Sequence, residues 1–281
     1  MSLSKEDRGS VGEHPCFSRK AHFQYGRLHL PVAPACNIQC AYCDRRSDCP
    51  NESRPGVSSA ILTPEQALER VEQALSQESQ LRVVGIAGPG DPLCNPAAME
   101  TLALVHRSFP HLILCLSTNG LLLPDKMEEL REYGVKTLTV TVNALRMETA
   151  RKLYSNIQYH GKVLPFEEGI PLLLDSQRMG VQRAAAAGIA VKINTVLVPG
   201  INDQETEPIA QAARRWGAVL MNLMPLIPQA ALSDSPAPTP NMMHEYRSAA
   251  AKSLPQFTHC KQCRADACGI PGQEPGPLQN R

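Results

Sequence analysis

The sequence lacks an excess of charge of either sign. Its 281 residues hold 28 Lys and Arg against 27 Asp and Glu, which gives a formal net charge of +1. We therefore do not expect a nucleic-acid-binding role driven by bulk positive charge. Aromatic residues are also scarce, at 4% with a single Trp216, so a platform for stacking bases is not expected either.

Long apolar runs are absent as well. No stretch approaches the roughly 18 residues that a membrane-spanning helix needs, and the opening MSLSKEDRGS is polar, without an apolar signal core. The hydrophobic fraction of 43% is nevertheless that of a globular protein. The sequence thus predicts a folded cytoplasmic protein that does not bind membranes, built as one large α/β domain or two small ones.

What the chain does contain is a regular alternation of strand and helix patterns. The β-branched run TLTVTV indicates a strand, and Thr63 followed by Pro64 indicates the start of a helix. The expected strands are 28–33, 81–87, 112–116, 137–142, 190–198 and 218–224. Helices are expected from residue 64 to about 75 and over 97–107, 125–133, 176–187, 203–215 and 241–252. Residues 154–170 show no clear period.

Repeated strand–helix units predict a parallel sheet with crossover helices. A full eightfold barrel takes about 250 residues, whereas the alternation here stops near residue 224. We therefore predict an α/β fold, a partial (β/α)6 TIM-like barrel over residues 28–227. An N-terminal arm, 1–27, would precede it, and a C-terminal tail, 228–281, would follow.

Ten cysteines are the unusual feature of the composition. In a reducing cytoplasm, clustered cysteines bind metal more often than they form disulfides. Cys36, Cys40 and Cys43 follow the first strand with the spacing C-x3-C-x2-C, which suits three irons of a cubane cluster and leaves one iron without a protein ligand. The spacing alone leaves two alternatives open: a zinc site completed by Cys49, and one face of a buried helix.

Polar residues and glycines lie where several expected strands end. Barrel enzymes bind their ligands at the C-terminal ends of the strands, so these residues are candidates for lining a pocket. Each of them could equally serve only to cap a strand or turn. They are Gly88, Gly90, Asp91, Thr118, Asn119, Thr141, Asn143, Ile193 and Asn194.

The motif C-x3-C-x-Y-C after the first strand of such a barrel resembles the radical S-adenosylmethionine (SAM) superfamily. The resemblance implies that Cys36, Cys40 and Cys43 hold a [4Fe–4S] cluster and that the strand-end residues bind SAM. It also implies cleavage of SAM to a 5′-deoxyadenosyl radical.

Further motifs narrow the resemblance. His14-Pro15-Cys16, the run CPNESRPGV from Cys49, ILCLSTNG with Cys115, and Cys260-x2-Cys263 are together similar to the NifB family, maturases that build the iron–sulfur core of the nitrogenase cofactor. The similarity runs from about residue 14 to 270 and indicates the short form without a NifX-like domain. It implies that two [4Fe–4S] clusters are fused into a carbide-containing eight-iron core, with SAM as methyl donor and radical source.

The same resemblance implies six ligands for the two precursor clusters, three for each. They are His14, Cys16, Cys49, Cys115, Cys260 and Cys263. From the residues alone, Cys115 could be an ordinary core thiol, and the last two cysteines could be half of a zinc site. Cys268 and His259 are left outside this set.

Glu52, Ser53 and Arg54 follow Cys49 and are candidate catalytic residues, because a buried carboxylate there could take up protons. Loop hydrogen bonding is the alternative for these three residues. The implied partners are an iron–sulfur cluster donor, an electron donor and a cofactor carrier or scaffold protein. We expect a monomer, and we expect the proline-rich stretch 228–240 to let the tail close over the barrel mouth. Another radical SAM enzyme and a non-catalytic metal carrier are the competing functions.

Overall fold

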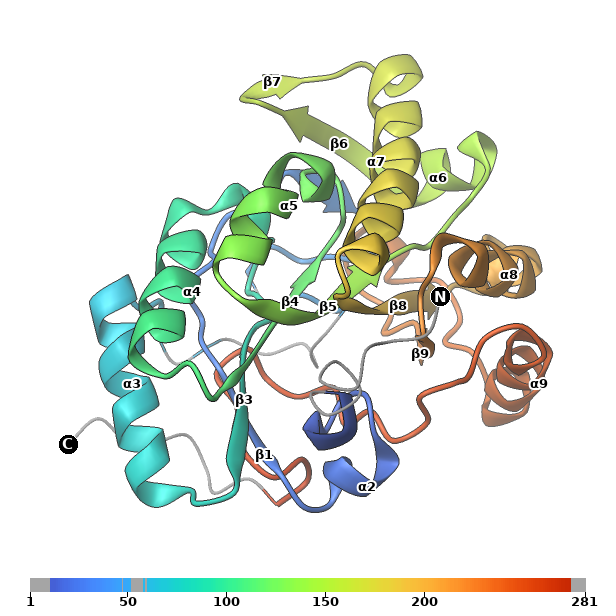
Figure 1. Ribbon diagram of the computed structural model, residues 1–281. Helices are drawn as coiled ribbons and strands as arrows, with labels where there is room; N and C mark the ends of the chain where they lie inside the picture. Colours follow the sequence, from blue (N-terminus) through green and yellow to red (C-terminus); the bar gives the residue numbers. More distant parts are fainter. Residues whose placement is uncertain (1–10, 47, 52–57, 59, 274–281) are drawn as a thin grey trace.

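A curled seven-stranded sheet forms the centre of the protein (Figure 1). The computed structural model describes residues 11–46, 48–51, 58 and 60–273. The strand order is β10-β1-β3-β4-β5-β8-β9, and all neighbours are parallel except β10 and β1. The parallel strands are β1 (Gly26–His29), β3 (Leu81–Ile86), β4 (Ile113–Thr118), β5 (Val135–Thr141), β8 (Ala190–Leu197) and β9 (Leu220–Pro225). The predicted partial barrel of six parallel strands is therefore confirmed.

Helices cover the outer face of this sheet, as Figure 1 shows. The main ones are α3 (Pro64–Gln77), α4 (Pro96–Ser108), α5 (Leu123–Glu132), α7 (Phe166–Ala186), α8 (Thr206–Trp216) and α9 (Pro240–Ala251). Shorter helical segments are α2 (Arg19–His22), α6 (Met147–Leu153), η1 (Pro92–Cys94), η2 (Asp203–Glu205) and η3 (Ala230–Leu232). Thr63 and Gln66 form a capping box at the start of α3. Outward-facing strand residues such as Leu114 and Val191 pack under the helices, which leaves the inner face of the sheet for polar residues.

The region expected to be irregular, 154–170, is ordered. It contains β6 (Tyr154–Tyr159), β7 (Lys162–Val163) and the first turn of α7, which begins ten residues before the predicted start. Gly169 and Pro171 obscured that start, because both residues ordinarily interrupt helices. In the structure Gly169 lies against Ile157 so closely that an added Cβ would be 3.1 Å from the Ile157 Cβ, so its small size is needed for packing.

The three-cysteine segment does not form a helix. Ile38–Cys40 is strand β2, which pairs antiparallel with β6 and forms a small second sheet, β2-β6-β7. The reading of these cysteines as one face of a buried helix is therefore wrong. The preceding strand, predicted over 28–33, ends at His29, since Pro31 has no N–H to donate to a strand neighbour.

The C-terminal segment closes the side that the six-stranded barrel leaves open. The Phe257 amide donates to the Met221 carbonyl of β9 at 2.6 Å. Further along, β10 (Cys268–Gly269) pairs with β1 through Leu28 and Cys268. Residues 257–269 therefore run from the last parallel strand to the first, which differs from the expected closure over the barrel mouth.

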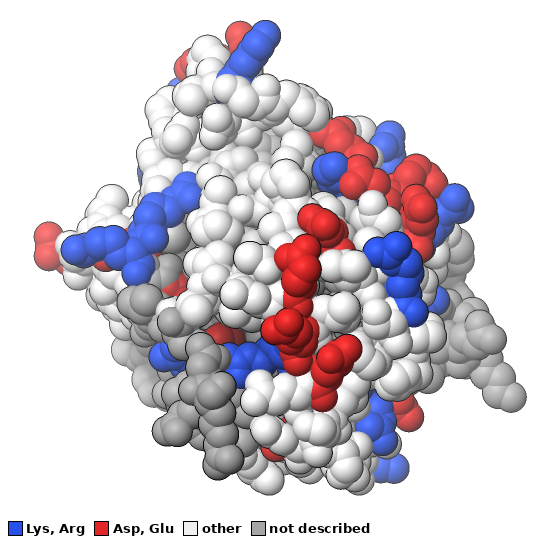
Figure 2. Space-filling view, turned by 90° about the vertical axis from the view of Figure 1, so that its left-hand side faces the viewer, with Lys and Arg blue, Asp and Glu red and all other residues white. Residues whose placement is uncertain are grey.

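The surface carries mixed charge. Figure 2 shows the side of the molecule that includes α3, where a row of acidic side chains lies among basic ones. Glu65, Glu69 and Glu72 are exposed on α3. None of the helices in the described part of the chain is long and apolar enough to cross a membrane.

Candidate functional site

Two neighbouring cavities lie within the barrel. The upper cavity is at the C-terminal ends of the parallel strands and contains the three-cysteine loop. The inner cavity lies between the inward faces of the strands and the two terminal segments. Ala87 and Ser117 line both, so one thin wall separates them.

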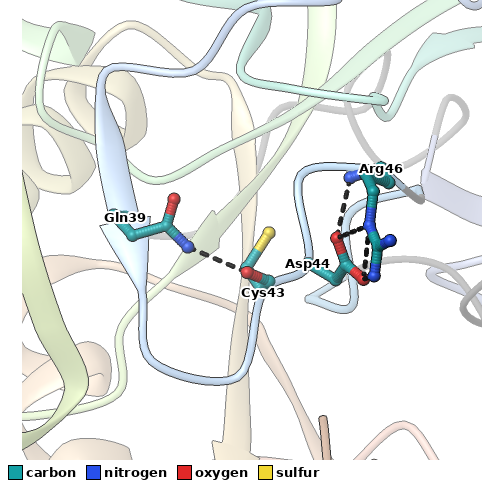
Figure 3. Close-up of polar contacts among 4 residues, drawn as sticks. All are labelled: Gln39, Cys43, Asp44 and Arg46. Atoms are coloured by element: carbon teal, nitrogen blue, oxygen red, sulfur yellow. Dashed lines mark hydrogen bonds and ion pairs between the residues drawn. The ribbon is translucent and has the colours of Figure 1, made fainter. Parts of the chain in front are cut away.

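The shape of the cysteine loop is set by its own backbone. The Cys43 amide donates to the Cys40 carbonyl at 3.0 Å, and Gln39 Nε2 donates to the Cys43 carbonyl at 2.8 Å (Figure 3). Arg45 donates to Gln39 Oε1 at 2.7 Å and also to the Ile38 carbonyl. These bonds place the thiols of Cys36, Cys40 and Cys43 along one cavity.

The three thiols suit an iron–sulfur cluster. Burial raises the pKa of Cys36 to about 11 and raises the pKa values of Cys40 and Cys43 as well. Among the residues that the structure describes, no three His, Cys, Asp or Glu side chains are grouped to hold one metal ion. A cubane needs no such convergence, because each thiolate binds a different iron.

Asp91 joins the turn after β3 to the end of β4. Its carboxylate accepts hydrogen bonds from the Asn119 amide at 2.6 Å and from Thr118 Oγ1 at 2.9 Å. Burial raises the pKa of Asp91 above its usual value. These bonds fix a polar wall beside the cysteine loop, where Asn119 Nδ2 donates to Asn37 Oδ1 at 2.7 Å.

Gly90 lines the upper cavity and also has a packing role. A Cβ at Gly90 would lie 1.9 Å from the Ala35 carbonyl oxygen, and the Gly90 amide donates to the Ala33 carbonyl at 2.6 Å. The glycine lets the turn pack directly against the segment that leads into the cysteine loop.

The structure brings together five of the nine strand-end candidates. These five line the upper cavity: Gly90, Asp91, Thr118, Asn119 and Thr141. Gly88 lies between Cys49 and Ala265, whose Cβ atoms are 3.8 and 3.7 Å from a Cβ built on it. Asn194 lines the inner cavity instead.

The other two strand-end candidates do not reach either cavity. Asn143 is fully buried, donates to the Tyr42 hydroxyl at 2.6 Å and accepts from the Val196 amide at 2.8 Å. The side chain of Ile193 lies in the hydrophobic core. Both side chains therefore have a structural role in this fold.

Five of the six expected precursor-cluster ligands line the inner cavity. They are His14, Cys16, Cys115, Cys260 and Cys263, which come from the N-terminal arm, β4 and the C-terminal segment. Burial raises the pKa of Cys16 to about 12. The thiols of Cys115, Cys260 and Cys263 also raise this pKa, through electrostatic repulsion. No disulfide joins any of the ten cysteines, all of which are described.

Cys49 is the exception. It lines the upper cavity, and the three loop cysteines raise its pKa electrostatically in addition to the larger effect of burial. Gly88 separates Cys49 narrowly from Ala265 of the C-terminal segment. Glu52, Ser53 and Arg54 lie outside the described residues.

The structure adds two histidines that the sequence analysis missed, His22 and His29. His22 Nδ1 lies 3.0 Å from the Pro15 carbonyl. His29, at the end of β1, lines the inner cavity, and its Nδ1 lies 3.0 Å from the Arg264 carbonyl. Burial lowers the pKa of His29 to about 4, so the ring is neutral near pH 7. The carbonyl can only accept, so Nδ1 carries the proton and Nε2 has the lone pair. The sequence signal that could have found His29 is its spacing from Arg27. Two polar residues two positions apart lie on the same face of a strand.

His14 has the opposite tautomer. Its Nδ1 accepts from the Cys16 amide at 3.0 Å, so the proton of the neutral ring is on Nε2. Burial lowers the pKa of His14 well below its usual value. Among the described residues, Nε2 of this buried ring has no hydrogen-bond partner.

The sequence is similar to those of known proteins. Residues 30–213 match a protein family described as "Radical SAM superfamily". The FeMo cofactor biosynthesis protein NifB of Methanocaldococcus infernus is 43% identical over 259 residues, which cover 92% of this chain and 85% of that protein. The chain belongs to the NifB family of the radical SAM superfamily.

Other NifB-family proteins are longer. The protein of the same name from Klebsiella pneumoniae is 48% identical over 268 residues, covering 93% of this chain and 57% of its own length. The chain thus spans between half and two thirds of the length of several curated relatives that it matches.

A solved structure supports the fold of this NifB-family member. The crystal structure of methylornithine synthase aligns with all of this chain and 85% of its own, with a TM-score of 0.52 and 14% identity. At that identity the similarity concerns the barrel alone. The resemblance inferred from the cysteine motifs is confirmed at the level of the family.

Proposed function

We propose that the chain is a radical SAM maturase that fuses two [4Fe–4S] clusters into the carbide-containing eight-iron precursor of the nitrogenase cofactor. The relatives' printed name, FeMo cofactor biosynthesis protein, supports this function. The observation that carries the proposal is the pair of cavities with a shared wall. One holds the three-cysteine loop, and the other gathers four more cysteines and three histidines.

The upper cavity is the site for the resident cluster and SAM. Cys36, Cys40 and Cys43 would hold the cluster, which with SAM supplies both a methyl group and a 5′-deoxyadenosyl radical. Asp91 holds Thr118 and Asn119 in place beside the cysteine loop, so the wall that receives SAM is preorganised. The shared wall at Ala87 and Ser117 keeps the path from SAM to the inner cavity short.

The inner cavity is the site for the two substrate clusters. Cys16, Cys115, Cys260 and Cys263 provide thiolate ligands, and sulfur donors suit iron–sulfur clusters. The hydrogen bonds favour His29 over His14 as the nitrogen ligand, since Nε2 has a lone pair in His29 and a proton in His14. A ligating histidine ordinarily donates its other ring N–H to an oxygen acceptor, as His29 does to Arg264. His14, expected as a ligand, then offers an N–H to the substrate.

Cys49, which lines the upper cavity and lies close to the C-terminal segment across Gly88, completes the proposed ligands. Glu52, Ser53 and Arg54, which begin three residues after it in the chain, are proposed to handle the protons removed from the methyl carbon. We also propose a cytoplasmic monomer that works with a cluster donor, an electron donor and a cofactor carrier protein.

The test is an anaerobic assay of the reconstituted full chain with SAM and dithionite. We expect both S-adenosylhomocysteine and 5′-deoxyadenosine, from methyl transfer and radical formation. Cys115→Ser should abolish the first product, whereas Cys94→Ser, a thiol that lines neither cavity, should leave it unchanged. Deoxyadenosine alone would indicate another radical SAM reaction, and neither product would indicate a metal carrier.

A further inference from the structure

The wall of the inner cavity formed by β8 and β9 carries polar groups for which the proposed function has no role. Lys192 and Asn222 line this cavity. Lys192 and Asn194 are two residues apart on β8 and so share one face of the strand, and Asn194 pairs with Asn222 of β9. The three side chains therefore lie together on one part of the inner wall.

Lys192 is a buried cation within reach of the candidate ligands. Its side chain is only 4% exposed, and its ammonium group lies 5.5 Å from the centre of the Phe17 ring and 5.6 Å from that of Phe257. Its charge lowers the pKa of His14 and of His29. A buried positive charge at this place favours an anion in the same cavity, because burial strengthens electrostatic attraction.

Asn222 provides a second and independent indication. It is 1% exposed, and among the described residues neither its amide nitrogen nor its amide oxygen has a hydrogen-bond partner. Buried amides are nearly always hydrogen-bonded, and exceptions call for an explanation. An amide that lines a cavity and has no partner among the described residues is available to a ligand in that cavity.

We propose that Lys192 and Asn222 form an anion-binding site on the β8–β9 wall, called here the anion seat, that binds anionic sulfur. Lys192 supplies the charge, and Asn222 donates an N–H to the sulfur. The sulfur belongs either to a bridging sulfide of a substrate cluster or to a small sulfur-bearing anion beside it. The inference rests on the proposed function only in that the inner cavity receives iron–sulfur clusters.

The test isolates the inner cavity by using the full chain with Cys36→Ala, Cys40→Ala and Cys43→Ala, in which the resident cluster cannot bind. If the seat holds a cluster sulfide, Lys192→Met shifts the midpoint potential of the remaining clusters to more negative values. The loss of a positive charge destabilises the reduced, more negative cluster. Lys192→Arg should restore the potential, and Lys136→Met, which removes an exposed lysine of β5, should not change it.

If the seat holds a small anion, thiocyanate should change the electron paramagnetic resonance spectrum of the loaded protein but not that of Lys192→Met. Asn222→Leu gives a check that does not depend on the lysine. It should raise the unfolding temperature, since it removes an unpartnered buried amide, and yet alter the same potential or the same thiocyanate response. If the Asn222 amide had only a structural role, the substitution would change the unfolding temperature but neither the potential nor the thiocyanate response.

Unchanged potentials and unchanged thiocyanate responses in both variants would overturn the anion seat. Failure of the proposed function would look different. In the same background, Cys115→Ser and Cys260→Ser should lower the iron content. Iron content unaffected by those two changes would remove the clusters from the inner cavity, whatever Lys192 and Asn222 do.

Discussion

At the scale of single residues, the position of one proton distinguishes two histidines that the sequence does not separate. His14 stands in a motif with Cys16, whereas His29 stands alone in an apolar strand. Nδ1 of His14 accepts a hydrogen bond from the Cys16 backbone amide, whereas Nδ1 of His29 donates one to the Arg264 carbonyl. The spacing of a motif shows which residues are near each other, but the tautomer is set by partners distant in the chain.

The first prediction follows from these tautomers. His29→Ala should remove the ¹⁴N coupling from the pulsed electron paramagnetic resonance spectrum of the inner-cavity clusters, because it removes the nitrogen lone pair. His14→Ala should keep that coupling and only shift the spectrum, since it removes an N–H donor. A coupling lost in His14→Ala and kept in His29→Ala would reverse the assignment.

The second prediction concerns Gly90. Gly90→Ala should lower the free energy of unfolding by about 1–3 kcal/mol, the usual cost of overpacking. The added Cβ would overlap the Ala35 carbonyl. It should also reduce iron loading of the upper cavity. Urea unfolding and iron analysis measure the two effects. Gly12→Ala is the matched control, since a Cβ there meets no atom within 4 Å, and a similar loss in both variants would contradict the packing argument.

At the scale of elements, the sequence predicts what repeats locally and misses what pairs at a distance. The six strand–helix units were predictable because each has its own period and caps. The β10–β1 pairing joins Leu28 to Cys268, and two residues of strand have no local pattern to reveal them. The first turn of α7 was missed because glycine ordinarily weakens a helix, and the close packing of Gly169 against Ile157 is visible only in the structure. The cavity residues Lys192 and Asn222 were missed for the same reason: inward-facing positions are recognised only once the barrel closes.

The third prediction concerns the segment that closes the barrel, residues 257–269. It is held at Met221 and at Leu28, while Cys260 and Cys263 face the cavity between these two points. Iron loading of the inner cavity should therefore slow tryptic cleavage after Lys261 and Arg264. Cleavage after Lys162, exposed in β7, should keep its rate, which makes it an internal control. Equal protection of this segment with and without iron would count against ligation by the two cysteines.

At the scale of the whole molecule, the buried thiols link metal content to the pH dependence of stability. Without metal, burial raises the pKa of Cys36 to about 11 and of Cys16 to about 12, from an ordinary value of 9.0. Above about pH 9 the unfolded chain loses these protons while the folded chain keeps them. Stability therefore falls as the pH rises through that range. Bound iron reverses this relation, because each ligating thiol has already lost its proton and acid returns it.

The fourth prediction is that the metal-free and iron-loaded chains show opposite pH slopes. Anaerobic urea unfolding from about pH 6 to about pH 10 should show the metal-free chain losing stability toward the alkaline end, and the iron-loaded chain losing stability and iron toward the acid end. Cys36→Ser together with Cys16→Ser should flatten the alkaline slope of the metal-free chain, since a serine hydroxyl does not titrate there. Cys94→Ser is a weaker control for this experiment, because burial raises the pKa of that thiol to about 12 as well. Its removal should flatten the metal-free slope but leave the acid slope of the loaded chain unchanged, and that difference separates thiols that are merely buried from thiols that bind iron.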